Sequence, residues 1–135
     1  MVRDIDLMKM AEEARLGAYA PYSDFLVGAA LLTRSGKVYT GCNIENASFG
    51  ATNCAERTAF FKAISEGERE FSAIAIVGGK RQDPPTFCPP CGICRQVMAE
   101  FCGSEFRILL GNSNKLEAFK LATILPLSFG QDDLH

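Results

Sequence analysis

Apolar residues along the chain of 135 residues follow helical and strand-like periods in turn. Near the N-terminus, apolar residues such as Leu7 and Ala11 recur at helical spacing, and the charged residues of this segment, including Arg15, lie mostly off that face. The pattern predicts a helix over residues 4–19, which ends before Pro21.

Short runs of apolar and β-branched residues, bounded by turn residues, predict strands in the rest of the chain. Two of these runs flank the turn Arg34–Lys37, so residues 25–42 are expected to form an antiparallel hairpin. Helical patterns predict two further helices, over residues 53–66 and from near Cys91 to about Phe101. The predicted strands cover residues 25–32, 38–42, 71–77 and 106–110, and a weaker pattern predicts a short strand at 115–120.

The order of these elements predicts the fold class. Two strand–helix–strand units follow the hairpin, and such units place helices against a sheet that contains parallel strands. We therefore expect an α/β fold, a three-layer sandwich in which a mixed sheet of about five strands is flanked by helices. No linker or repeat divides the sequence, so residues 1–135 are expected to form one domain.

Composition and charge narrow the classes of function. A net charge of −2 argues against a nucleic-acid-binding protein, which would normally carry a basic excess. No apolar run approaches the roughly 20 residues of a membrane span. The N-terminus has no apolar core of a signal peptide, so a cytoplasmic protein is expected.

Six cysteines against one histidine point to metal binding or redox chemistry. The chain is large enough to have a hydrophobic core without disulfides, and it shows no sign of secretion. Because His135 is the last residue, a metal site would have to be built from thiolates and carboxylates.

Two segments where a loop becomes a predicted helix carry the candidate ligands. One contains Cys54 and Glu56, and the other contains Pro90 followed by Cys91 and Cys94. Helix N-termini carry a partial positive charge, which favours thiolates. Three sulfurs would bind Zn²⁺ and leave the fourth tetrahedral position to water, as in a catalytic site.

Glu56 has two interpretations that the spacing alone does not separate. It could be a proton carrier beside the zinc-bound water, or it could form a capping box with Asn53, which is a purely structural device. In an ideal helix residues 54 and 56 point about 200° apart. The catalytic interpretation therefore requires Cys54 to lie at the very start of the helix.

These two segments match the pattern of zinc nucleobase deaminases, in which H-x-E or its cysteine variant is followed by P-C-x-x-C. Beyond this pattern, the chain resembles the cytidine deaminases of the small homotetrameric type with three zinc-binding cysteines. The resemblance covers nearly the whole length and rests on the order of four further segments: Ala20–Phe25, Val27–Leu31, Gly41–Ser48 and Leu125–Pro126.

The resemblance implies zinc-dependent hydrolytic deamination of cytidine and 2′-deoxycytidine to uridine and 2′-deoxyuridine, a step of pyrimidine salvage. It implies one Zn²⁺ per subunit, held by Cys54, Cys91 and Cys94, with Glu56 carrying protons to N3 and to the leaving amine. It also implies that Arg57 withdraws charge from the thiolates, although Arg57 could instead be a solvated helix charge. The implied partners are a small nucleoside and three further copies of the chain, with active sites near subunit interfaces, but neither nucleic acid nor a membrane.

The resemblance further assigns a set of substrate contacts. Asn43 and Glu45 are expected to bind the ribose, and Phe129 of a neighbouring subunit is expected to stack on the pyrimidine. The remaining expected contacts are Phe25, Ala47, Phe49 and Ala55.

Two positions depart from the family pattern. Phe49 stands where the family usually has Tyr, and Thr123 stands where it usually has Glu. Outside the zinc site, Cys88 is formally another ligand candidate, but Pro89-Pro90 separates it from the helix. Cys42 and Cys102 are expected to be buried small apolar residues.

Three other functions compete with this interpretation. A structural zinc module would need four ligands. A thiol–disulfide enzyme would use the C-x-x-C pair of Cys91 and Cys94 and leave Cys54 and Glu56 unexplained. A deaminase of the same fold could act on an aminonucleoside antibiotic or on cytosine in a polynucleotide, although the acidic charge argues against the latter.

Overall fold

Five strands form one mixed sheet in the order β2-β1-β3-β4-β5 in the computed structural model, which describes residues 1–134. His135 lies outside the described residues. The helices are α1 (Asp4–Arg15), α2 (Ala55–Ser65), α3 (Gly92–Phe101) and α4 (Leu121–Ile124), with 3₁₀ turns at Phe49–Ala51 and Gln131–Leu134. The strands are β1 (Phe25–Thr33), β2 (Val38–Cys42), β3 (Phe71–Lys80), β4 (Arg107–Gly111) and β5 (Leu116–Lys120).

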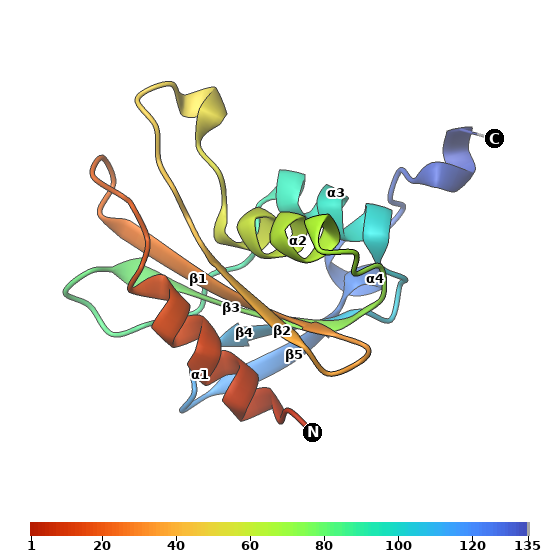
Figure 1. The fold of residues 1–135 in the computed structure, drawn as a ribbon, viewed down its shortest axis with the longest axis horizontal. Helices are drawn as coiled ribbons and strands as arrows, with labels where there is room; N and C mark the ends of the chain where they lie inside the picture. The colour runs from red at the N-terminus through yellow and green to blue at the C-terminus, as the bar shows by residue number, and fades with distance from the viewer. Residues whose placement is uncertain (135) are drawn as a thin grey trace.

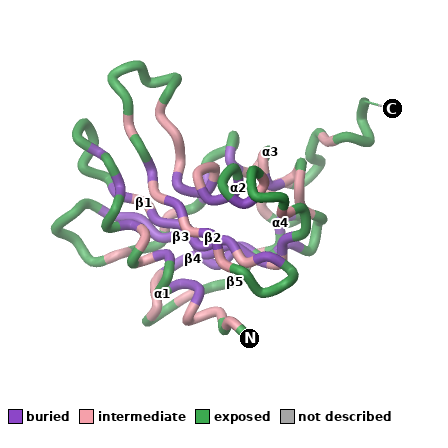
Figure 2. Tube along the Cα trace, in the orientation of Figure 1, coloured by how far each residue is buried: buried purple, intermediate pink, exposed green. Residues whose placement is uncertain are grey.

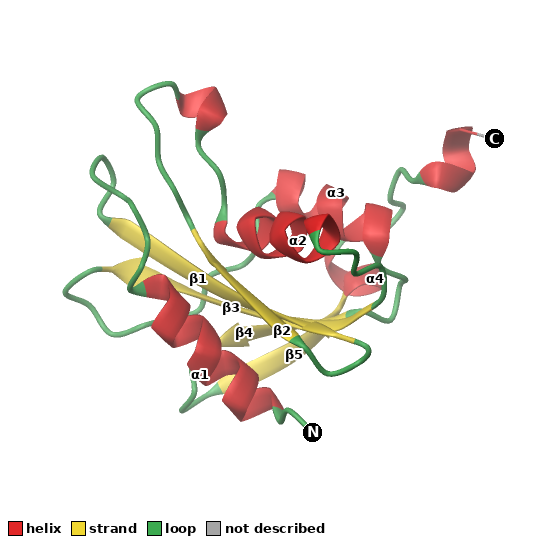
Figure 3. Cartoon of the chain, in the orientation of Figure 1, coloured by secondary structure: helices red, strands yellow, loops and turns green. Residues whose placement is uncertain are grey.

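The strand pairing confirms the predicted α/β fold (Figure 3). β1 pairs antiparallel with β2 as the expected hairpin, in a register that places Leu32 opposite Val38. β1 also pairs antiparallel with β3, and β3 pairs parallel with β4 across the connection that contains α3. The weakly predicted strand at the end of the chain is β5, which pairs antiparallel with β4.

The sheet is the middle layer of three. Figure 1 shows α1 on one face of the sheet and α2, α3 and α4 on the other. Successive side chains of β3 point to opposite faces of the sheet, so this strand packs against both helix layers. Ile74 and Ile76 join the apolar cluster under α2 and α3, whereas Ala73 and Ala75 join the cluster under α1. The buried residues accordingly follow the strands and the inner faces of the helices (Figure 2).

Two glycines allow helix backbones to approach the sheet closely. A Cβ atom at Gly28 would lie 2.0 Å from the carbonyl oxygen of Ala11 in α1. On the opposite face, a Cβ atom at Gly41 would lie 2.5 Å from the carbonyl oxygen of Ala55, the first residue of α2. Since α2 begins beside the candidate ligand Cys54, Gly41 helps to set the position of the candidate site.

The N-terminal helix differs from the prediction in two respects. It ends at Arg15, whereas the periodicity extended it to residue 19, because the chain turns after Leu16. Arg15, expected off the apolar face, is only 3% exposed. Its Nη2 atom donates hydrogen bonds to the carbonyl oxygens of Gly79, Lys80 and Asp83, which compensates for burying that end of the guanidinium group, whereas the buried Nε atom has no partner within residues 1–134.

None of the helices described for residues 1–134 has the length and apolar character required to cross a membrane.

Candidate metal centre and active site

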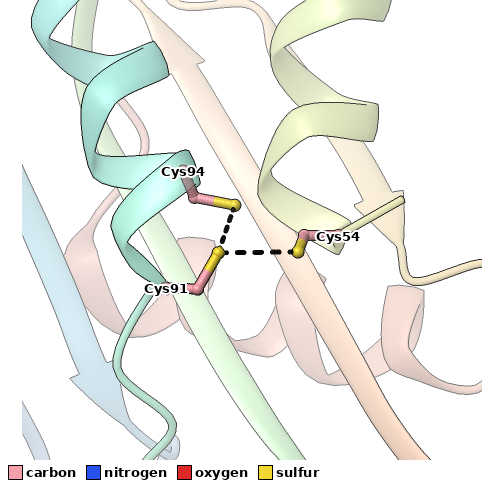
Figure 4. Close-up of side chains that lie close together, drawn as sticks. All are labelled: Cys54, Cys91 and Cys94. Carbon is pink, nitrogen blue, oxygen red and sulfur yellow. Dashed lines mark hydrogen bonds between the residues drawn. The ribbon is translucent and has the colours of Figure 1, made fainter. Parts of the chain in front are cut away.

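The N-termini of α2 and α3 bring three cysteines together (Figure 4). Cys54 is the N-cap of α2 and Cys91 is the N-cap of α3, and both have extended backbone dihedrals. Cys94 lies in the first turn of α3 and is buried. Unpaired N–H groups and the positive end of the helix dipole therefore face the sulfurs from two helices, which favours thiolates.

The sulfur positions fit a zinc ion. The Sγ atom of Cys91 lies 3.8 Å from that of Cys54 and 3.5 Å from that of Cys94, and all three lie within 4.8 Å of one another. Zinc–sulfur bonds of about 2.3 Å at tetrahedral angles would place sulfurs about 3.8 Å apart. Thiolate sulfur is a soft ligand that suits zinc, so donor type and spacing agree.

The cluster has three members. Within residues 1–134, no fourth ligand atom from a His, Cys, Asp or Glu side chain joins it. Cys88 lies elsewhere, with its side chain against Gly78 of β3. A tetrahedral ion on these three sulfurs would keep an open position, so the geometry disfavours the closed structural zinc module.

Glu56 lies at the start of α2 beside the cysteines and is 4% exposed. Burial raises its pKa to about 7, and the negative charge of Cys54 acts in the same direction. The geometric requirement on Cys54 is met, because this residue is the N-cap that precedes the helix and its backbone is extended rather than helical.

The capping-box interpretation of Glu56 is wrong. The N-cap of α2 is Cys54, not Asn53, and no side chain caps this helix. Asn53 instead donates a hydrogen bond from Nδ2 to Oγ1 of Thr58. A buried carboxyl group without a capping role is available for chemistry.

Arg57 contacts the cluster directly. Its Nη2 atom lies 3.3 Å from Sγ of Cys54, and its buried Nε atom has no hydrogen-bond partner. The pKa of Cys54 falls to about 5, because hydrogen bonds from Cys94 and then Arg57 stabilise its thiolate. The hydrogen bond that Cys94 donates to the Cys54 thiolate, together with burial, raises the pKa of Cys94. The interpretation of Arg57 as a solvated helix charge is therefore wrong.

Asn43 stabilises the start of β1. Its Oδ1 atom accepts a hydrogen bond from the backbone N–H of Val27 at 2.8 Å, and its Nδ2 atom donates to the carbonyl oxygen of Phe25 at 2.8 Å. An asparagine amide has two donor hydrogens and two acceptor lone pairs, so one of each remains for a ligand.

Glu45 joins two loops. Its Oε1 atom accepts hydrogen bonds from the backbone N–H groups of Tyr22 and Ser23, and its Oε2 atom accepts one from Oγ of Ser23. These bonds, that of the Ser23 hydroxyl first, lower the pKa of Glu45 and keep it ionised. Glu45 lines a pocket of about 360 Å³ together with Tyr22, Ser23, Asn46, Phe49 and Thr52.

The other expected substrate contacts lie in different surroundings. Phe25, 38% exposed, begins β1 with its ring against Gly78, and Ala55 is fully buried at the start of α2. Ala47 and Phe49 lie on the exposed loop between β2 and α2, which extends away from the sheet (Figure 1). Phe129 lies on the C-terminal segment, 58% exposed, and its carbonyl oxygen accepts a hydrogen bond from Nε2 of Gln96 in α3.

Two residues next to the site were not predicted from the sequence. Ser23 holds Glu45, and its only signal is its place in the segment Ala20–Phe25. Arg95 follows the ligand candidate Cys94 and donates hydrogen bonds to two carbonyl oxygens. No periodicity or spacing indicates that contact.

Comparison with known proteins agrees with this geometry. The model of the cytidine and deoxycytidylate deaminase zinc-binding region matches residues 1–109, which include all three cysteines of the cluster. The chain belongs to the cytidine and deoxycytidylate deaminase family. The matched zinc-binding region and the cysteine cluster together support one zinc ion per chain.

Individual deaminases are similar over nearly the whole chain. A cytidine deaminase of Halalkalibacterium halodurans is 51% identical over 130 residues, which are 96% of each chain. One of Sporosarcina psychrophila is 49% identical over 129 residues, covering 95% of this chain and 92% of the relative. The crystal structure of cytidine deaminase from Burkholderia pseudomallei superposes with a TM-score of 0.86 at 46% identity, covering 94% of this chain and 99% of that one.

Proposed function

We propose that this protein is a cytidine deaminase that hydrolyses cytidine and 2′-deoxycytidine to uridine and 2′-deoxyuridine with release of ammonia. The observation that carries the proposal is a buried carboxyl group, Glu56, beside an open set of three cysteine sulfurs. Two relatives at 51% and 49% identity bear the name cytidine deaminase, which supports this substrate over an aminonucleoside antibiotic.

The chain's own residues divide the chemical work. Zinc, when bound by Cys54, Cys91 and Cys94, supplies the Lewis acidity that makes water a nucleophile near neutral pH. Glu56 accepts the first proton of the water as the water oxygen bonds to C4 of the pyrimidine, and it delivers this proton to N3. Glu56 then accepts the second proton of the former water as the C4–O bond becomes a carbonyl, and it passes this proton to the departing amine, which leaves as ammonia. A pKa of about 7 suits a group that must both accept and donate a proton.

Arg57 has the role of lowering the negative charge on sulfur. Three thiolates on a divalent ion leave a net negative charge, which weakens its Lewis acidity. The hydrogen bond from Arg57 to Cys54 and the two helix N-termini draw electron density from the sulfurs. The arginine contact therefore compensates for the absence of a neutral histidine ligand.

The loops around the site would recognise a nucleoside. Asn43 keeps a free donor and a free acceptor, and Glu45 is held ionised, so both can bind ribose hydroxyl groups. We assign Phe25 to a pocket wall and the Ala55 backbone to the base. Ala47 and Phe49 would complete the sugar side, and Phe129 of a neighbouring subunit would stack on the pyrimidine.

The assembly we propose is a homotetramer with active sites near its interfaces. It is supported by two large aromatic side chains on projecting segments, Phe49 at 82% and Phe129 at 58% exposed, because an isolated chain gains little from presenting them to water. We place the protein in the cytoplasm, in pyrimidine salvage, since its six cysteines are free thiols and a thiolate zinc site needs a reducing compartment.

The decisive experiment measures uridine and ammonia formed from cytidine by the zinc-loaded protein and by Glu56→Gln. Wild type should produce both. Glu56→Gln should keep its zinc but lose at least about 100-fold in turnover, because the proton carrier is gone. Glu13→Gln changes an exposed carboxylate on α1 and serves as the matched control.

Absence of product from zinc-loaded wild type would refute the proposal. A structural zinc module would give unchanged zinc and no product for both proteins. A thiol–disulfide enzyme would reduce disulfides through Cys91 and Cys94 and would be inhibited, not activated, by stoichiometric zinc.

A further inference from the structure

The guanidinium group of Arg95 joins two segments that are far apart in the sequence. Its Nε atom donates a hydrogen bond to the carbonyl oxygen of Pro90 at 2.9 Å. Its Nη1 atom donates to the carbonyl oxygen of Ile124 at 2.6 Å. One side chain of α3 thus connects the residue before Cys91 to the end of α4.

The contact with Pro90 fixes the backbone next to a zinc ligand. Pro90 is buried, and neither it nor Pro89 has an N–H group to donate a backbone hydrogen bond. The backbone N–H of Arg95 also donates to the carbonyl oxygen of Cys91 at 3.0 Å. Arg95 therefore binds the carbonyl group that precedes Cys91 and the carbonyl group of Cys91 itself. These two contacts fix the backbone of Cys91 and so orient its side chain.

The contact with Ile124 fixes the start of the C-terminal segment. Ile124 is the last residue of α4, and carbonyl groups at a helix end have no partner within the helix. Five residues later, Gln96, the neighbour of Arg95 on α3, donates a hydrogen bond to the carbonyl oxygen of Phe129. Consecutive residues of α3 therefore hold the segment 124–129 at both ends.

We propose that Arg95 is a positioning residue that couples retention of zinc by Cys91 to the placement of the C-terminal segment 124–129. The inference rests on the zinc-ligand role of Cys91 and Cys94 in the proposed function. Arginine suits this role because Nε and Nη1 point toward different acceptors, whereas the single amino group of lysine can reach only one of them at a time.

The test compares four zinc-loaded variants with wild type. Arg95→Gln removes both contacts, and Arg95→Lys can keep one. Gln96→Ala frees only the Phe129 end of the segment. Arg69→Gln is the matched control, because Nη1 of Arg69 also donates to two carbonyl oxygens near a helix end, those of Ile64 and Glu68, but at the C-terminus of α2.

Two readouts are measured besides turnover. The first is the rate at which a zinc-binding dye, 4-(2-pyridylazo)resorcinol, takes zinc from each protein. The second is amide hydrogen exchange of residues 121–134 by mass spectrometry. Thermal melts establish that each variant is folded before either readout is compared.

Arg95→Gln should release zinc about 10- to 100-fold faster than wild type, the usual effect of losing a group that orients a metal ligand. The same variant should exchange faster over residues 121–130. Arg95→Lys should lie between it and wild type. Gln96→Ala should change exchange near Phe129 but not zinc release, and Arg69→Gln should change neither.

Equal zinc release by Arg95→Gln and Arg69→Gln would overturn the inference, as would unchanged exchange in the C-terminal segment. If Arg95→Gln does not fold, Arg95→Lys decides by the same two readouts. Failure of the proposed function would give a different result. Wild type would then form no uridine from cytidine, while Arg95→Gln would still change zinc release and amide hydrogen exchange.

Discussion

At the scale of single residues, the chemistry of the site depends on where Cys54 meets its helix. As the N-cap of α2, Cys54 brings its sulfur to the positive end of the helix, and Glu56 follows in the first turn, where burial and the charge of Cys54 raise its pKa. One residue later along the chain, Arg57 donates to that sulfur. The proposed ligand, proton carrier and charge partner therefore come from the four consecutive residues 54–57.

The Arg57 contact leads to a prediction about turnover. Arg57→Gln should lower kcat about 10- to 100-fold, because the thiolates lose their cationic partner and the zinc becomes a weaker Lewis acid. The far-ultraviolet circular dichroism spectrum and the zinc content should stay at wild-type values. Wild-type kcat in a fully zinc-loaded variant would contradict the role given to Arg57.

Thiol pKa values lead to a second residue-scale prediction, tested with iodoacetamide at pH 7. Burial raises the pKa of Cys88 to about 11 and that of Cys102 to about 12, so at pH 7 at most about one such thiol in 10⁴ is ionised and reactive. Cys54, with a pKa of about 5, is almost fully ionised once zinc is removed. Peptide mass spectrometry should therefore find labelling of Cys54 in chelator-treated protein first.

Zinc-loaded protein is the control in this experiment. Its ligand cysteines should resist labelling, because their lone pairs are bound to the metal. Faster labelling of Cys88 or Cys102 than of Cys54 after chelation would contradict the order of acidities.

At the scale of elements, the two layers of helices are placed by glycines as much as by apolar side chains. Gly28 lets α1 approach β1, and Gly41 lets the first turn of α2 approach β2. Because Cys54 and Glu56 lie at the start of α2, the close packing of Gly41 against this helix also sets the position of the metal centre.

Gly41→Ala should therefore weaken both stability and zinc binding. The added Cβ would lie 2.5 Å from the carbonyl oxygen of Ala55 and 2.6 Å from the backbone nitrogen of Ala59, so α2 must move. The free energy of unfolding should fall by about 1–3 kcal/mol, as for other overpacked sites. Urea denaturation and dye competition for zinc measure the two effects.

Gly103→Ala is the matched control, because nothing lies within 4 Å of a Cβ atom at Gly103. Its stability and zinc affinity should equal those of wild type. A Gly41→Ala protein as stable as Gly103→Ala would show that α2 does not depend on the close approach.

At the scale of the whole molecule, the described chain has aromatic side chains on segments that extend from the sandwich. The loop with Phe49 and the C-terminal segment with Phe129 both project from the face that carries α2 and α3 (Figure 3). Contacts between copies would bury these side chains and bring a neighbour's Phe129 to the nucleoside. Light scattering should give the mass of four copies of a 14.7 kDa chain.

The proposed sharing of active sites between subunits also predicts complementation between two defective variants. Coexpressed Glu56→Gln and Phe129→Ala chains should form mixed tetramers in which a site with intact Glu56 receives Phe129 from a neighbour. The kcat/KM of the mixture should exceed the mean of the two separate variants. No gain in a verified mixed tetramer would indicate that Phe129 does not act in a neighbouring site.

Much of the fold and the cluster of three cysteines could be predicted from the sequence, because both depend on local signals. The periodicity of apolar residues and the positions of turn residues located the five strands and the three longer helices, and the predicted bounds of β2 agree with the observed Val38–Cys42. Cys54, Glu56, Cys91 and Cys94 are recognisable because two short motifs lie at predicted helix starts. Their meeting in space requires the sheet to bring the N-termini of α2 and α3 together, and the match of both motifs to the deaminase pattern made that meeting predictable.

Contacts between distant residues were decided only by the tertiary structure. The sequence could not separate a capping role from a proton-carrying role for Glu56, since both share the spacing from Asn53; the backbone of Cys54 settled which residue caps the helix. The buried side chain of Arg15 and the side chain of Arg95 donate hydrogen bonds to carbonyl groups of segments that are distant in the sequence. The periodicity of apolar residues does not indicate either contact. Sequence patterns report which face of an element is buried, whereas a polar side chain's partners depend on which elements come to lie beside it.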